Sequence, residues 1–199
     1  MKRLESGRIV LEPVTARNAA TLWRIMQSAH LREYQDVPRY ARDEFERRVA
    51  ARPRIFDGRA LGRFEWLVVV RETSLAVGWI SLRVGEVGGG AAEIGYSILK
   101  AHRGRGMARD AVRALVTQAF ASTSLRRIEA CCIPANVPSR RLLERLGFTI
   151  SKRQRNGAIV RGRPVDILVF DMRREAWAGG TAYDESAKAM VMPASANPK

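Results

Sequence analysis

Cysteine is scarce in this chain of 199 residues, which contains only Cys131 and Cys132. Adjacent cysteines are badly placed to bridge one another within the usual disulfide geometry, so a secreted disulfide scaffold is excluded. Long apolar runs are also missing. Residues 1–10 hold no stretch long enough for a signal peptide, and no window of about 20 apolar residues occurs. We therefore expect a soluble protein of the reducing cytoplasm, with no membrane partner.

Acidic residues are few relative to basic ones, with 20 Asp and Glu against 35 Lys and Arg, a formal net charge of +15 and an isoelectric point near 11.1. Most of the basic side chains are arginine. Such a field attracts polyanions, nucleotide phosphates and acidic partners, although it does not determine the fold. Histidine occurs only as His30 and His102, neither in a cluster with metal-ligand spacing, so no metal site is expected.

The rest of the composition is that of an ordinary globular protein, with 46% hydrophobic and 28% charged residues, which argues against collagen-like, disordered and coiled-coil chains. The length fits one domain with modest extensions. Residues 178–199 are small, polar and proline-containing, with no sustained apolar period. We expect one domain over residues 1–177, followed by a tail that is either loosely held or docked on a neighbouring chain, as in a homodimer.

Hydrophobic periodicity predicts a mixed α/β protein. Alternating or β-branched runs indicate strands at residues 8–14, 64–70, 75–84, 91–99, 127–133, 148–154 and 165–172. Helical spacing indicates helices at residues 16–29, 39–52, 106–120 and 139–146. A glycine-rich loop spans residues 85–90, and a turn with Asn156, Gly157, Gly162 and Pro164 separates the last two strands. About seven strands in this order predict one mixed sheet with helices on both faces.

The most informative segment is the loop between the strand at residues 91–99 and the helix that begins near Gly106. It reads Arg103-Gly104-Arg105-Gly106-Met107-Ala108. Glycines let the backbone turn tightly and approach a ligand, while the amides and positive dipole of a helix start attract phosphate oxygens. The two arginines add charge-assisted donors. The spacing is neither a P-loop nor a dinucleotide fingerprint, which disfavours kinases and dehydrogenases, and a solvated basic loop is the alternative interpretation.

This loop resembles the Arg/Gln-x-x-Gly-x-Gly/Ala signature of the GNAT superfamily of acetyl-CoA-dependent N-acetyltransferases, which Arg103, Gly106 and Ala108 match. Three further stretches are similar to its RimJ/RimL-like branch, which is related to ribosomal-protein N-terminal acetyltransferases. They are AEIGY at residues 92–96, the stretch from NVPS to RLLERLGF at residues 136–148, and residues 162–170. The resemblance covers about residues 8–174. It implies a mostly antiparallel sheet that splays between its fourth and fifth strands, at residues 93–99 and 127–133.

The resemblance further implies that acetyl-CoA is the co-substrate and binds in the cleft between those two strands. Its pantetheine arm would pair like an added strand with exposed backbone of Tyr96, Ser97 and Ile98. A backbone amide near Ile98 would polarise the thioester carbonyl. The Asn136 side chain would also hold the pantetheine, although asparagine is equally a natural turn residue. The pyrophosphate would rest on the loop, whose cofactor-binding residues are Arg103, Gly104, Arg105, Gly106, Met107 and Ala108.

Two catalytic residues are implied by the same resemblance. Ser139 would protonate the departing thiolate, although a serine after a proline is also a good helix N-cap. Glu93 would take a proton from the acceptor amine, directly or through water. In the alternative interpretation, the Glu93 carboxylate only forms an ion pair with one of the many arginines. Tyr96 is either a proton carrier facing the cleft or a core aromatic. Cys131 and Cys132 are expected to point to opposite faces of their strand as buried thiols.

The sequence therefore predicts an acetyl-CoA-dependent N-acetyltransferase that acetylates a primary amine. A protein N-terminus is the first choice of acceptor and a small-molecule amine is the second. The arginines of such an enzyme would steer an acidic acceptor toward the site or dock the enzyme on the ribosome. The alternative function is a basic nucleic-acid- or ribosome-binding module that has kept the fold and lost turnover.

Overall fold

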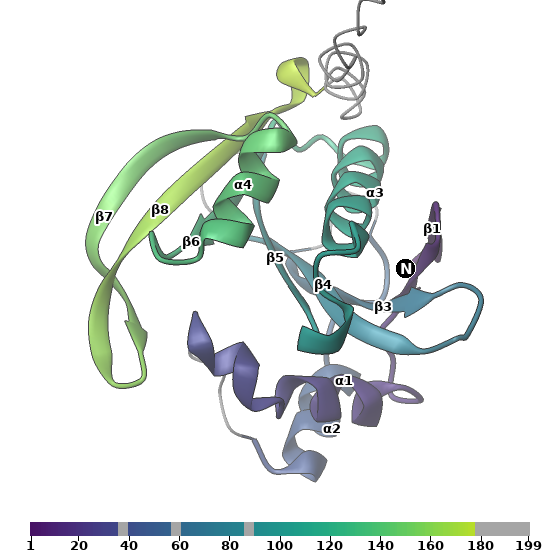
Figure 1. The fold of residues 1–199 in the computed structure, drawn as a ribbon. Helices are drawn as coiled ribbons and strands as arrows, with labels where there is room; N and C mark the ends of the chain where they lie inside the picture. The colour runs from purple at the N-terminus through teal and green to yellow at the C-terminus, as the bar shows by residue number, and fades with distance from the viewer. Residues whose placement is uncertain (36–39, 57–60, 86–89, 178–199) are drawn as a thin grey trace, which may run out of the picture.

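The computed structural model describes residues 1–35, 40–56, 61–85 and 90–177 (Figure 1). The expected tail at residues 178–199 and most of the glycine-rich loop at residues 85–90 lie outside the described residues. The described strands form one eight-stranded sheet in the order β1-β2-β3-β4-β5-β6-β8-β7. The mixed α/β architecture expected from the sequence is therefore confirmed.

The described elements follow the expected order along the chain. The strands are β1 (Leu4–Ser6), β2 (Ile9–Pro13), β3 (Gly62–Val70), β4 (Ala76–Val84), β5 (Ala91–Ile98), β6 (Arg127–Cys132), β7 (Thr149–Val160) and β8 (Arg163–Arg173). The helices are α1 (Ala19–Met26), α2 (Arg42–Ala50), α3 (Met107–Ser122) and α4 (Val137–Arg145), with single 3-10 turns η1 (Ala29–Glu33), η2 (Lys100–His102) and η3 (Arg174–Ala176). The sequence analysis missed β1, which is too short to show an alternation.

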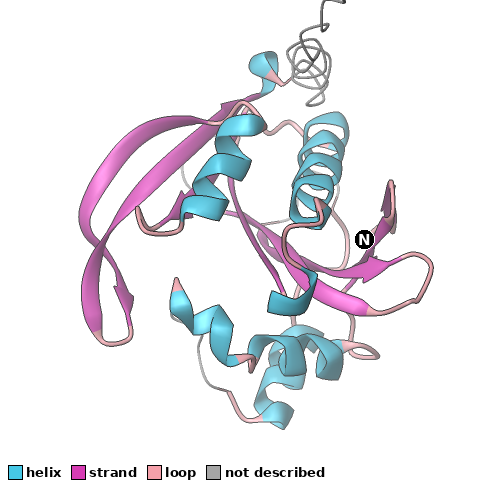
Figure 2. Ribbon diagram, in the orientation of Figure 1, coloured by secondary structure: helices cyan, strands magenta, loops and turns pink. Residues whose placement is uncertain are grey.

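Side chains alternate across the sheet and build one apolar core on each face. On β3, Phe64, Trp66 and Val68 belong to the core that also contains α3 and α4. The intervening Leu67 and Val69 belong to the core that contains α1 and α2. Figure 2 shows these two helix pairs on opposite sides of the sheet. The expectation of helices on both faces is confirmed.

The sheet is open between β5 and β6. These strands pair in parallel from Ala91 opposite Arg127 to Ile94 opposite Ala130, and the pairing ends there. On its other edge β5 remains paired with β4 as far as Gly78 opposite Ile98. The last residues of β5 therefore present a backbone edge without a β6 partner, as the expected splay requires. All the remaining pairs of neighbouring strands in the described chain are antiparallel.

Gly78 allows β4 and β5 to stay together beside this opening. A Cβ atom at Gly78 would lie 2.3 Å from the Ser97 carbonyl oxygen and 2.8 Å from the Ile98 side chain. Gly78→Ala should lower the free energy of unfolding by about 1–3 kcal/mol because the backbone of β5 must shift to admit the methyl group. Chemical denaturation measures this change. Gly85→Ala is the matched control, since a Cβ there meets nothing within 4 Å, and equal stability of the two variants would contradict the prediction.

The hairpin formed by β7 and β8 is longer than the sequence indicates. The predicted turn is right at Gly162 and wrong at Asn156 and Gly157, because β7 continues to Val160 through a register shift between Gln154 and Ala158. Asn156 adopts a φ of +49° within this irregularity, and its backbone N–H donates to Asp166 Oδ1 at 3.1 Å. The true turn is Arg161-Gly162, with φ of +53° and +74°, as two-residue hairpin turns require. The long hairpin curves away from the body of the protein (Figure 1).

Candidate active site

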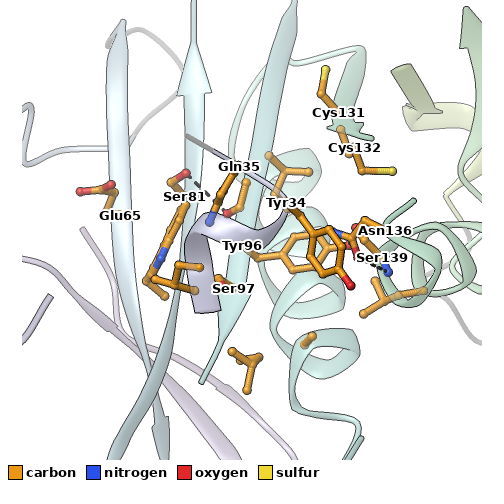
Figure 3. Close-up of a pocket in the computed structure, with 18 of the residues that line it drawn as sticks. Tyr34, Gln35, Glu65, Ser81, Tyr96, Ser97, Cys131, Cys132, Asn136 and Ser139 are labelled. Atoms are coloured by element: carbon orange, nitrogen blue, oxygen red, sulfur yellow. Dashed lines mark hydrogen bonds between the residues drawn. The ribbon is translucent and has the colours of Figure 1, made fainter. Parts of the chain in front are cut away.

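A cavity of about 1310 Å³ lies where β5 and β6 separate, and it runs from the start of α3 to side chains on β3, β4 and α2. Figure 3 shows Tyr96, Ser97, Asn136 and Ser139 around it. The site residues predicted from the sequence that line the cavity are Glu93, Tyr96, Ser97, Ile98, Arg103, Gly104, Gly106, Met107, Ala108, Asn136 and Ser139. Arg105 is exposed and does not line it.

The loop before α3 leaves the start of that helix open. Gly104 and Gly106 have φ of +75° and +80°, and a Cβ on either would meet nothing within 4 Å. Gly106 is the N-cap of α3, so no side chain caps the first-turn amides. Arg103 fixes the loop to the end of β5, since its Nε donates to the Ile98 carbonyl oxygen at 3.0 Å. α3 is 16 residues long, and the uncapped amides at the start of such a helix suit a phosphate group.

Two hydroxyl groups of the cavity lining meet. Tyr96 Oη lies 2.9 Å from Ser139 Oγ, which joins the end of β5 to the first turn of α4. Burial raises the pKa of Tyr96 above its ordinary value, so the phenol stays protonated at neutral pH. The pair can therefore donate a proton to a group in the cleft.

The helix cap is supplied by Asn136 and not by Ser139. Asn136 is the N-cap of α4, and its Oδ1 accepts a hydrogen bond from the Ser139 N–H at 3.3 Å (Figure 3). The interpretation of Ser139 as the cap is thus wrong, because the helix begins two residues earlier than the sequence indicates. The Ser139 hydroxyl is left to face Tyr96.

The two cysteines both line the cavity but differ in exposure. Cys132 is buried as expected, whereas Cys131 is exposed, so the expectation of two buried thiols is wrong for Cys131. Partial desolvation in the cavity wall raises the pKa of each thiol to about 11, even though the Cys131 residue is exposed, and hydrogen bonding from Ser139 to the Cys132 sulfur offsets only part of the rise at Cys132. Both groups are therefore neutral thiols at pH 7 and weak nucleophiles.

Glu93 lies on β5 beside the last paired residues, and its carboxylate forms an ion pair with Arg83 of β4. This contact raises the pKa of the Arg83 guanidinium. The alternative interpretation of Glu93, a carboxylate paired with an arginine, is thus what the structure contains. Glu93 still lines the cavity, so its proposed role as a base has to operate from within an ion pair.

The sequence analysis missed the residues at the other end of the cavity. They are Arg52 from the segment after α2, Arg63 and Glu65 on β3, and Ser81 and Arg83 on β4. Glu65 is 1% exposed and bonds to both Arg52 and Arg63. A signal was available, since Glu65 is a charged residue inside an otherwise apolar run, FEWLVVV at residues 64–70. A buried carboxylate in such a run needs a cationic partner.

No metal centre or membrane span accompanies the cavity in the described parts of the chain. No group of three or more His, Cys, Asp or Glu side chains among the described residues is placed to hold a metal ion. No described helix is long and apolar enough to cross a membrane. His30 lines the cavity near Arg103, and burial is the main reason that its pKa is lowered.

Comparison with known proteins identifies the family. A family model described as an acetyltransferase (GNAT) domain matches residues 8–149. The chain belongs to the GNAT acetyltransferase family. It is 29% identical over 184 residues to the uncharacterized N-acetyltransferase p20 of Bacillus licheniformis, a match that covers 90% of this chain and 100% of that protein.

Solved GNAT structures share the fold at low sequence identity. The ribosomal-protein-S5-alanine acetyltransferase of Vibrio fischeri has a TM-score of 0.75 at 19% identity, covering 89% of this chain and 99% of its own. RimJ of Mycobacterium smegmatis in complex with CoA-disulfide has a TM-score of 0.67 at 22% sequence identity, and the match covers 87% of this chain and 87% of that chain. A chimera of spermidine N-acetyltransferase from Vibrio cholerae and hSSAT has a TM-score of 0.74 at 16% sequence identity, and the match covers 85% of this chain and 97% of that chain. Proteins named for different acceptors are thus about equally similar to this one.

The family assignment makes the protein an acyltransferase whose co-substrate is acetyl-CoA. The chain is also 36% identical over 88 residues to the putative ribosomal N-acetyltransferase YdaF of Bacillus subtilis, a match that covers 44% of this chain and 48% of that protein and agrees with the RimJ/RimL-like resemblance of the sequence. Neither the family match nor the structural neighbours support the alternative of a nucleic-acid-binding module without turnover. The acceptor is left to be argued from the cavity itself.

Proposed function

We propose that this GNAT enzyme transfers the acetyl group of acetyl-CoA directly to the α-amine of a protein N-terminus. The pyrophosphate of acetyl-CoA lies at the start of α3, held by Arg103, Gly104, Gly106, Met107 and Ala108. Its pantetheine arm follows the backbone edge of Tyr96, Ser97 and Ile98, with Asn136 beside it. These residues all line one continuous cavity, which supports a single ligand reaching from the loop to the opening between β5 and β6.

The observation that carries the choice of acceptor is the state of the carboxylates. Among the described residues, Glu65 and Glu93 are the acidic side chains that line the cavity, and both are paired with arginines. A polyamine or an aminoglycoside carries several amines that stay protonated at neutral pH, and it needs free carboxylates to bind and to deprotonate it. An N-terminal α-amine has a pKa near 8, so an appreciable fraction is neutral without a strong base.

The chemistry then requires one bond to form and one to break. The neutral amine nitrogen attacks the thioester carbon, the carbon–sulfur bond breaks, and CoA leaves as a thiolate. The Ser139 and Tyr96 hydroxyls, 2.9 Å apart, supply the proton that the sulfur takes. The attacking nitrogen gives up its extra proton to water near Glu93, whose carboxylate is held in an ion pair with Arg83, and solvent returns a proton to the hydroxyl pair.

A thiol-release assay with acetyl-CoA and a panel of acceptors tests this proposal. The panel contains N-terminal peptides, the same peptides with a blocked α-amine, spermidine and an aminoglycoside. We expect release of CoA with free peptides, none with blocked peptides, and a much lower kcat/KM with the polycations. Faster turnover of spermidine or the aminoglycoside would overturn the choice of acceptor. Absence of both turnover and acetyl-CoA binding would overturn the enzymatic function.

A further inference from the structure

A row of charged side chains crosses the sheet at the end of the cavity lined by Arg52, Arg63 and Glu65, which we call the acceptor end. Arg63 on β3 lies opposite Arg83 on β4, which lies opposite Glu93 on β5, which lies opposite Glu129 on β6. Residues in register on neighbouring strands share a face and lie about 5 Å apart. Arg83 is paired with Glu93, and Glu129 is paired with Arg127 at 3.0 Å. Arg63 therefore depends on a carboxylate outside the row.

That carboxylate is Glu65, and it serves two arginines. Arg63 Nε lies 2.8 Å from Glu65 Oε1, and an Arg52 Nη1 contacts the other carboxylate oxygen. Two guanidinium groups against one carboxylate leave one positive charge in excess at a partly buried place. Burial lowers the pKa of Arg52 to about 10 and also lowers the pKa of Arg63, which Arg83 lowers further. Both stay charged at neutral pH, and a further anion would stabilise them.

The excess charge lies within reach of the opening. Ser81 Oγ is 3.5 Å from Arg63 Nη2 and 3.5 Å from the Gly95 carbonyl oxygen. Gly95 is the first residue of β5 beyond the last pair with β6. A Cβ at Gly95 would contact Ser81 Oγ at 3.3 Å and the Trp79 ring at 3.7 Å. Because Gly95 has no side chain, β5 places no side chain over Ser81 at this position.

We propose that Arg63 binds a carboxylate of the acceptor, namely an acidic side chain close behind the N-terminal amine of an acidic peptide. This inference rests on the proposed function and narrows its substrate class. A guanidinium has five N–H donors in a planar fork that matches a carboxylate, and the contacts with Glu65 and Ser81 occupy two of them. β3 lies two strand spacings from β5, about 10 Å. The long Arg63 side chain, one Cα–Cα step of about 3.8 Å and the acidic side chain of the second residue together bridge that distance.

Paired acceptor peptides test the assignment. Two peptides that differ only in aspartate or asparagine at the second position are compared by kcat/KM at saturating acetyl-CoA. We expect the wild-type enzyme to favour the aspartate peptide by about tenfold or more, mainly through KM. Arg63→Gln should reduce the ratio to about one, and Arg63→Lys should keep part of it. Arg71→Gln is the matched control, since Arg71 is paired with Glu5 at 3.0 Å and lies outside the cavity lining.

The outcomes separate this inference from the proposed function. Turnover of the asparagine peptide by the wild-type enzyme shows that the proposed function holds whatever the ratio. A wild-type ratio near one, or a ratio that Arg63→Gln leaves unchanged, would overturn the carboxylate site. Faster acetylation of free aspartate than of either peptide would overturn the peptide as its source. An unchanged acetyl-CoA affinity in Arg63→Gln excludes misfolding as the cause of a lost preference.

Discussion

Ser139→Ala is expected to lower kcat about ten- to a thousandfold while leaving the KM for acetyl-CoA nearly unchanged. The departing CoA thiolate needs a proton, and the Ser139 hydroxyl is held 2.9 Å from the Tyr96 hydroxyl in the cavity. Because Asn136 and not Ser139 caps α4, the substitution removes the donor without removing the helix cap. Steady-state kinetics with a saturating acceptor measures the effect.

Tyr96→Phe should reduce kcat by a similar factor, since it removes the other hydroxyl of the same pair and keeps the ring. Ser151→Ala is a matched control, because Ser151 lies on β7 outside the cavity lining, and its hydroxyl donates a hydrogen bond to the Val169 carbonyl oxygen at 3.1 Å. If Ser139→Ala kept wild-type kcat and changed only the melting temperature, the hydroxyl would have a structural role and the acid would lie elsewhere.

Gly106→Val is expected to weaken acetyl-CoA binding about ten- to a hundredfold, which corresponds to about 1.4–2.8 kcal/mol. Gly106 has a φ of +80°, and a β-branched residue in that region carries strain of about 1–3 kcal/mol. Relief of the strain would turn the first amides of α3 away from the pyrophosphate, and the added side chain would occupy the open space in front of them. Calorimetric titration with acetyl-CoA measures the loss.

Gly162→Val separates backbone strain from loss of the binding site. Gly162 has a φ of +74°, a Cβ there also meets nothing within 4 Å, and it lies in the β7–β8 turn outside the cavity lining. The Gly162→Val variant should have a lower free energy of unfolding, as Gly106→Val should, and should keep the wild-type affinity for acetyl-CoA. Equal affinity losses in the two variants would contradict the assignment of a phosphate site to the loop.

The half of the cavity that the sequence predicts is encoded locally. Arg103, Gly104, Gly106 and Ala108 stand within six consecutive residues at a strand-to-helix junction, so their spacing alone places them together. The opening beside them depends only on where the pairing of β5 with β6 ends, at Ile94. Arg105 shows the limit of this reasoning, because a side chain between two left-handed glycines can be exposed away from the site.

The acceptor half is set by long-range pairing that a single sequence does not reveal. Arg63 meets Ser81 only because β3 and β4 pair in one particular register, and a shift of one strand by one residue would place the two side chains on opposite faces of the sheet. Arg52 reaches Glu65 from the segment after α2, whose placement depends on the packing of a whole helix pair. The start of α4 is a finer case, since both Asn136 and Ser139 are good caps by type and only the backbone decides between them.

Hydrogen exchange with and without acetyl-CoA tests the central claim most directly, namely that the thioester binds along the unpaired edge of β5 with its pyrophosphate at the start of α3. Amides at residues 95–98 and 103–108 should exchange more slowly when acetyl-CoA is bound, because the ligand covers or bonds to them. Protection at both segments together is the predicted result. Protection confined to other parts of the chain, with both segments exchanging as in the free protein, would contradict the account.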